Sequence, residues 1–145
     1  MAAVRSARTV WEGTLTEGSG LLSTGTSSVL VDVPVTWGSR TEDPQGRTSP
    51  EELLAASFAS CFAMALSGGL TKAGSPPDRL DVSADCTFDQ VGDGWKVTTM
   101  DVAVRGLVPG IHATGFAKAV ADQECPISRA LSPDVTILKR GELIE

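Results

Sequence analysis

The sequence predicts an α+β fold, and three observations lead to that class. Residues 80–89 alternate strictly between apolar and polar side chains, which is typical of a half-buried strand. Residues 9–33 contain short strand-like segments separated by turn residues. Between these two strand groups, residues 50–73 form a long helical segment that is apolar on most of its faces. Two groups of strands around one buried helix indicate an α+β domain.

Length and composition are those of a single domain covering residues 1–145. The chain has 145 residues, of which 41% are hydrophobic, and that is enough to build a core at this size. No Pro-, Gly- or Ser-rich linker is long enough to divide the sequence.

The N-terminal third is predicted to be strands followed by a loop. Residues 9–33 resemble a small antiparallel meander, with a turn at Glu17-Gly18-Ser19-Gly20. Residues 34–49 are predicted to be a loop, because proline and glycine recur in them. The residues concerned are Pro34, Gly38, Pro44 and Gly46.

The central helix, residues 50–73, has the clearest start signal. Ser49 is a favourable N-cap, Pro50 suits the first turn, and Glu51 and Glu52 place negative charge there. Almost all of the body is apolar or small, so most of its faces should be buried. A chain of this size can hardly enclose such a helix alone. We therefore expect a homodimer in which a second copy covers it.

The C-terminal half is predicted to be a strand hairpin, a helix and a last strand. The hairpin spans residues 79–106 with its turn at 91–94, and the second helix spans 111–123. Residues 125–139 hold a Cys-Pro turn, a short helical turn and a last strand from Asp134 to Lys139.

The charge of the chain argues against several classes of partner. Its net charge is −6, its sequence pI is about 4.7, and its basic residues are scattered. A nucleic acid or an anionic membrane surface is therefore a poor partner. No apolar run has the length of a signal peptide or a membrane span, so a soluble cytoplasmic protein is expected.

Two thiols, Cys61 and Cys125, are the candidate reactive groups. Cytoplasmic thiols are kept reduced, so a disulfide between them would be transient and catalytic or sensory. The reactive form is the thiolate, and an unperturbed thiol has a pKa of about 8.5. Burial on an apolar helix raises that pKa, so a reactive Cys61 needs a nearby cation. Arg40 and Arg47, both in the 34–49 loop, are the candidates.

Spacing along the helix constrains the role of Glu51. Glu51 and Cys61 are separated by ten residues, which is roughly 15 Å along a helix axis. They cannot contact one small group within the same subunit. Our hypothesis is a composite site, in which Arg40 and Glu51 of one chain face Cys61 and Cys125 of the other.

Simpler readings of the same residues remain open. A cysteine on an apolar helix face is usually an inert core residue, and Cys86, on the apolar side of its strand, fits that description. Glu51 could serve only the helix dipole, and Arg40 could be a solvated loop charge. Metal binding is a poor fit, because His112 is the only histidine and no Cys-x-x-Cys spacing occurs.

Several segments, in order along almost the whole chain, resemble the OsmC/Ohr family of thiol-dependent hydroperoxide reductases, and its OsmC branch most closely. The segments are Trp11-Glu12-Gly13, Trp37-Gly38-Ser39-Arg40, Thr48-Ser49-Pro50-Glu51-Glu52-Leu53-Leu54-Ala55-Ala56, Ser60-Cys61-Phe62-Ala63-Met64-Ala65-Leu66-Ser67, Val108-Pro109-Gly110-Ile111 and Cys125-Pro126-Ile127-Ser128. The long helix that carries Cys61, followed by the Cys125-Pro126-Ile127-Ser128 run, is the most specific part of the likeness.

The resemblance implies an intertwined homodimer, with antiparallel sheets wrapped around two long central helices and two sites at the subunit interface. It implies that Cys61 attacks a hydroperoxide and becomes a sulfenic acid, and that Cys125 resolves it as a disulfide. Arg40 and Glu51 match the activating residues. The implied reductant is a dithiol, typically lipoyl groups on proteins, and no metal, flavin or haem cofactor takes part.

The expected function is therefore defence against oxidative or osmotic stress by reduction of organic hydroperoxides, and more weakly of hydrogen peroxide. The apolar side chains Phe58, Phe62 and Met64 are expected to give the pocket this preference. Two alternatives stay open: a dimeric module that binds a small apolar ligand, and a redox sensor that oxidises stoichiometrically.

Overall fold

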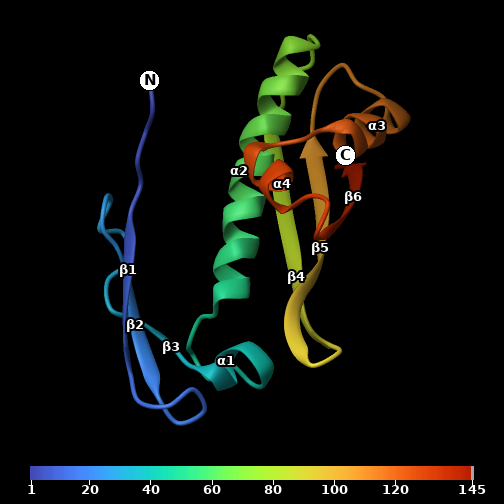
Figure 1. Ribbon diagram of the computed structural model, residues 1–145. Helices are drawn as coiled ribbons and strands as arrows, with labels where there is room; N and C mark the ends of the chain where they lie inside the picture. Colours follow the sequence, from blue (N-terminus) through green and yellow to red (C-terminus); the bar gives the residue numbers. More distant parts are fainter. Residues whose placement is uncertain (145) are drawn as a thin grey trace. The chain divides into compact units, whose positions relative to one another are not determined.

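The computed structural model describes residues 1–144, and the chain separates into two compact units, Met1–Leu53 and Leu54–Glu145. Each unit is described by itself (Figure 1).

The first unit is built on a three-stranded antiparallel sheet. Its strands are β1 (Ala7–Glu12), β2 (Ser19–Thr24) and β3 (Val33–Val35), paired in the order β1-β2-β3. β1 and β2 form a hairpin in which Glu12 faces Ser19, and β2 then pairs with β3. The meander expected over residues 9–33 is thus a sheet that begins slightly earlier and ends slightly later.

The segment 34–49, predicted to be a loop, contains the short helix α1 (Trp37–Thr41). Thr36 caps it: its side chain accepts from the N–H of Ser39 at 3.1 Å, and the Ser39 hydroxyl accepts from the N–H of Thr36 at 3.1 Å. This is a capping box in which serine replaces the usual Glu or Gln, so the usual sequence pattern does not predict this helix start.

The first unit has very little core of its own. Among the residues that the structure describes, Leu22 is the only buried hydrophobic residue before Leu53, and it is still 8% exposed. Eight large apolar side chains of this unit are exposed, namely Met1, Val4, Val10, Trp11, Leu15, Leu21, Val29 and Val31. Burial of apolar area is the main force that holds a fold together, so this unit contributes little to the stability of a lone chain.

The second unit contains a three-stranded sheet with the order β4-β5-β6, formed by β4 (Arg79–Val91), β5 (Gly94–Leu107) and β6 (Thr136–Leu143). β4 and β5 are the expected antiparallel hairpin, whereas β6 pairs with β5 in parallel, from Thr99 opposite Thr136 onward. The expectation of purely antiparallel sheets is therefore wrong at this edge. The chain crosses over through two helices before β6, and a crossover of this kind is what parallel neighbours require.

Helix α2 (Pro50–Lys72) supplies much of the core of the second unit. Phe58, Phe62, Leu66 and Leu70 recur every four residues, and they pack with the β5 side chains Met100, Val102 and Val104. Helices α3 (Ala113–Asp122) and α4 (Pro126–Leu131) form the crossover, with Phe116 and Val120 of α3 buried in the same core. The expected second helix, 111–123, is thus slightly shorter.

The other side of α2 stays exposed in this chain, as the 71% exposure of Met64 illustrates. By length and composition alone, α2 is also apolar enough to cross a membrane, although the sequence analysis expected no such segment. The same composition is found in core helices of water-soluble proteins, and the face that bears Phe58, Phe62 and Leu66 is buried against a sheet.

Candidate functional site

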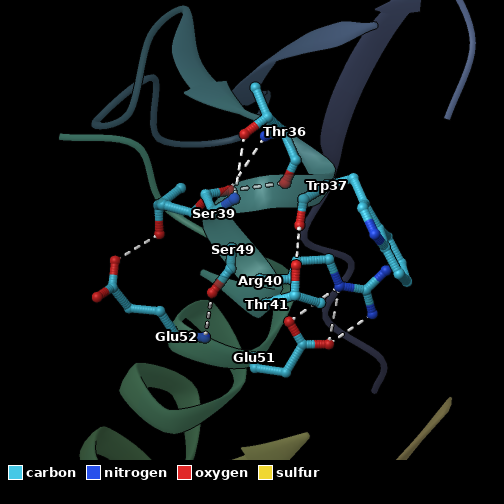
Figure 2. Close-up of polar contacts among 9 residues, drawn as sticks. Thr36, Trp37, Ser39, Arg40, Thr41, Ser49, Glu51 and Glu52 are labelled. Carbon is cyan, nitrogen blue, oxygen red and sulfur yellow. Dashed lines mark hydrogen bonds and ion pairs between the residues drawn. The ribbon is translucent and has the colours of Figure 1, made fainter. Parts of the chain in front are cut away.

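Arg40 and Glu51, two of the predicted site residues, form an ion pair within the first unit. The guanidinium Nε lies 3.1 Å from each Glu51 oxygen, and Nη2 lies 2.5 Å from Oε1 (Figure 2). The Glu51 side chain is only 8% exposed, whereas that of Arg40 is 27% exposed. A buried carboxylate is tolerated when it is fully paired, and the fork of donors on arginine provides that pairing.

The helix that carries Arg40 is fastened to the start of α2 by Ser39. The Ser39 hydroxyl lies 2.7 Å from the carbonyl oxygens of Thr36 and of Thr48. Ser49 then caps α2 by accepting from the N–H of Glu52 at 3.1 Å. On the other side of Arg40, the Trp37 ring lies beside the guanidinium, 5.4 Å from the ring centroid to the guanidinium carbon (Figure 2). These contacts fix the direction of the Arg40 side chain.

The alternative arginine, Arg47, is exposed, and its backbone N–H donates to the carbonyl of Pro44 in a turn. The carboxylate of Glu51 is held by Arg40. The sequence alone left both arginines open.

Cys61 and Cys125 are both free thiols of the second unit. Cys61 packs against the core cluster that contains Cys125, and each thiol shifts the pKa of the other. Cys61 is half-buried on α2, and Cys125 is 2% exposed at the N-cap of α4. The Cys125 sulfur accepts from the N–H of Ser128 at 3.4 Å, and the Ser128 hydroxyl bonds the N–H and carbonyl of Cys125. The remaining thiol, Cys86, is half-buried on β4 and packs against the core.

The two thiols differ in acidity. Burial raises the pKa of Cys61; the N–H of Ile127 opposes this change, and the Cys125 thiol reinforces it. Burial also acts to raise the pKa of Cys125. Hydrogen bonds from the Ser128 N–H and the Cys61 thiol, and weaker ones from the Ser128 side chain and the Ile127 backbone, act in the other direction. Together they outweigh burial, so the pKa of Cys125 is lowered. Burial alone therefore disfavours the thiolate of Cys61. A reactive Cys61 thiolate needs a further positive charge.

A cavity of about 530 Å³ lies beside Arg40 in the first unit. Its lining is mostly apolar and includes Trp11, Leu15, Leu22, Val35, Trp37 and Leu53. The sequence analysis had looked for an apolar pocket elsewhere, at Phe58, Phe62 and Met64. Phe58 and Phe62 are instead fully buried, with ring centroids 6.0 Å apart, and only Met64 is exposed. No spacing in the sequence indicates this cavity, because its lining comes from five separate elements, β1, β2, β3, α1 and α2.

The structure thus brings the four predicted residues together as two pairs, Arg40 with Glu51 and Cys61 with Cys125, each inside its own unit. Within residues 1–144, no three His, Cys, Asp or Glu side chains gather as a metal ion would need. A guanidinium held by a carboxylate and a pair of adjacent thiols are groups that suit redox chemistry at sulfur.

Comparison with known proteins gives consistent matches. A family model described as OsmC-like protein matches residues 42–138. Peroxiredoxin OsmC of Escherichia coli (strain K12) is 39% identical over 129 residues, which cover 88% of this chain and 89% of that protein. Peroxiredoxin OsmC of Shigella flexneri matches with the same identity and coverage.

Solved structures show the same fold at lower identity. The organic hydroperoxide resistance protein OhrB of Bacillus subtilis has a TM-score of 0.68 and 21% identity, covering 96% of this chain and 98% of its own. An OsmC-like protein from Mycoplasma pneumoniae has a TM-score of 0.73 and 12% identity, with full coverage of both chains.

Proposed function

The chain belongs to the OsmC-like protein family, and from this premise we propose that it is a thiol-dependent peroxidase that reduces organic hydroperoxides in defence against oxidative or osmotic stress. The observation that carries the proposal is the approach of Cys61 and Cys125 as free thiols. Two adjacent thiols can pass through a sulfenic acid to a disulfide and be returned by a reductant.

The proposed reaction begins at Cys61. Its thiolate attacks the terminal oxygen of the hydroperoxide, the O–O bond breaks, and the alkoxide leaves as an alcohol after taking a proton. Cys125 then attacks the sulfur of the Cys61 sulfenic acid: an S–S bond forms, the S–O bond breaks, and the oxygen leaves as water. A dithiol, for which lipoyl groups on proteins are our candidate, reduces the disulfide by two thiol exchanges.

Arg40 is the residue that we propose stabilises the Cys61 thiolate. Because burial raises the pKa of the Cys61 thiol, its thiolate needs a cation, and arginine stays charged when half-buried. Glu51 fixes the direction of the guanidinium through three contacts. We propose that this pair acts on the thiols of a second subunit in a homodimer, since one helix separates Glu51 from Cys61 by ten residues.

The preference for organic hydroperoxides rests on the cavity beside Arg40, whose lining is mostly apolar. An apolar lining favours the organic part of such a substrate over hydrogen peroxide. We propose a cytoplasmic location, because a reducing compartment returns the disulfide to the dithiol.

The test is to treat the reduced protein with one equivalent of cumene hydroperoxide and to map its thiols by mass spectrometry. We expect a Cys61–Cys125 disulfide with Cys86 still a reduced thiol, and no loss of reactivity in the matched control Cys86→Ser. Repeated turnover with a dithiol would separate a peroxidase from a stoichiometric sensor. Three unreacted thiols would contradict the proposal and favour the reading as an apolar ligand carrier. Equal turnover of hydrogen peroxide and cumene hydroperoxide would contradict the substrate preference.

A further inference from the structure

Lys139 lies on β6, an edge strand of the sheet in the second unit, and outside the motifs named in the sequence analysis. Its side chain is half-buried and makes two contacts. The ammonium donates to the backbone carbonyl of Gln123, and it lies over the Phe62 ring, 5.7 Å from the centroid. A lysine on a strand would ordinarily point its charge into water, so two contacts on protein groups indicate a defined position.

These contacts join the two segments that carry the thiols. Phe62 follows Cys61 on α2. Gln123 is the C-cap of α3 and lies two residues before Cys125, the N-cap of α4. Its carbonyl therefore belongs to the short connection between the two helices. One ammonium therefore links the backbone two residues before Cys125 to the ring of Phe62, the residue after Cys61. A hydrogen bond from a charged donor contributes more than a neutral one, and a cation over an aromatic ring adds to it.

We propose that Lys139 is a positioning residue for disulfide closure: it holds the Gln123–Cys125 connection so that Cys125 stays within reach of Cys61. The two contacts of Lys139 are with a backbone carbonyl and an aromatic ring, so the proposed action is on geometry. This inference deepens the proposed function, and for the peroxide reaction it rests on that function.

The step that depends on Lys139 is the condensation of the Cys61 sulfenic acid with the Cys125 thiol to give the disulfide and water. When the connection is loose, the sulfenic acid persists. With excess hydroperoxide it is then oxidised further to the sulfinic acid, which thiols do not reduce. Loss of Lys139 should therefore slow closure and raise overoxidation, while the first attack by Cys61 continues at its normal rate.

The first experiment measures thiol positioning without any peroxide. The reduced protein is equilibrated with mixtures of glutathione and glutathione disulfide, which exchange with the two thiols to give the Cys61–Cys125 disulfide and two glutathione molecules. Mass spectrometry gives the fraction of disulfide. We expect Lys139→Met to lower the equilibrium constant for closure by about tenfold. Lys139→Arg, which keeps a donor and a cation, should restore most of it.

The matched control is Lys118→Met, which removes one lysine from the same unit but breaks only an exposed pair with Asp122. It should leave closure unchanged. An unaltered equilibrium in a folded Lys139→Met protein would overturn the inference. A fall that Lys139→Arg does not restore would do the same, because it would show a general packing defect. Neither outcome bears on the proposed peroxidase activity.

The second experiment uses hydroperoxide and follows the two steps separately, with a sulfenic acid trap for the first and mass spectrometry of the disulfide for the second. We expect Lys139→Met to form sulfenic acid at the rate of the unsubstituted protein, to close the disulfide several-fold more slowly, and to accumulate sulfinic acid at Cys61. Equal slowing of both steps would contradict a positioning role. Failure of the unsubstituted protein to form sulfenic acid would instead refute the proposed function, and the glutathione result would still decide the role of Lys139.

Discussion

At the scale of single residues, the Arg40–Glu51 pair and the Cys61 thiol both depend on a nearby positive charge. Glu51 is a buried carboxylate whose charge is matched by one guanidinium at 2.5–3.1 Å. Cys61 is a thiol whose pKa is raised by burial. In the proposed dimer, the arginine that neutralises the carboxylate also supplies the positive charge that the thiol lacks.

The first prediction from this scale concerns pH. Without Arg40, the pKa of Cys61 stays raised by burial, so less thiolate is present at neutral pH and more appears as the pH rises. Arg40→Met should therefore lower kcat/KM for cumene hydroperoxide at pH 7 by about tenfold for each unit of pKa increase, and the loss should shrink toward alkaline pH. The pH profile of kcat/KM checks this. Arg47→Met is the matched control, and an unshifted profile in Arg40→Met would assign the activation to another group.

The sequence supplied the four candidate site residues, and their catalytic roles stay predictions. The ion pair between Glu51 and Arg40, rather than Arg47, had to come from the structure. Lys139 was missed because its contacts depend on where β6 lies relative to α2 and to the α3–α4 connection. No spacing in the sequence encodes such a contact.

At the scale of elements, local signals predicted the helices and strands well and their partners less well. The start of α2 was correctly predicted from Ser49, Pro50 and the two glutamates. The alternation of apolar and polar residues correctly predicted β4. The parallel pairing of β6 with β5 was not predicted, because pairing direction is set by the path of the α3–α4 crossover rather than by strand composition.

The packing of α3 on the sheet gives a prediction for this scale. A Cβ added to Gly106 of β5 would lie 2.5 Å from the ring of Phe116, so Gly106→Ala forces the helix or the ring to move. We expect this substitution to lower the free energy of unfolding by roughly 1–3 kcal/mol. Gly94→Ala, on the same strand with nothing within 4 Å, is the matched control. Urea unfolding of both variants measures the difference, and equal stability would mean that α3 does not pack tightly at this point.

At the scale of the whole molecule, the proposed homodimer accounts for features that one chain leaves unexplained. The first unit exposes most of its large apolar side chains, and α2 buries only one of its faces. Large exposed apolar surface usually marks an interface. A second copy would cover these surfaces, and it would also let Arg40 and Glu51 meet the thiols of the other chain.

Mixed dimers test this arrangement. Cys61→Ser and Glu51→Gln chains are each expected to be nearly inactive alone. If the site is composite, a heterodimer holds one intact site, so a randomly mixed sample should recover about one quarter of the unsubstituted activity. The control is a mixture of Cys61→Ser and Cys125→Ser chains, which cannot restore both thiols to one site. Recovery no greater than the sum of the separate samples would place all four residues in one chain.

The sparse core of residues 1–53 has a consequence for how the protein is made. This segment leaves the ribosome before residues 54–144, yet Leu22 is its only buried hydrophobic residue among those described. The later segment holds the large core of α2, β5 and α3. Domains generally fold as they emerge, N-terminal part first. Most of the apolar area that stabilises the fold is therefore supplied by the segments that are made after residue 53.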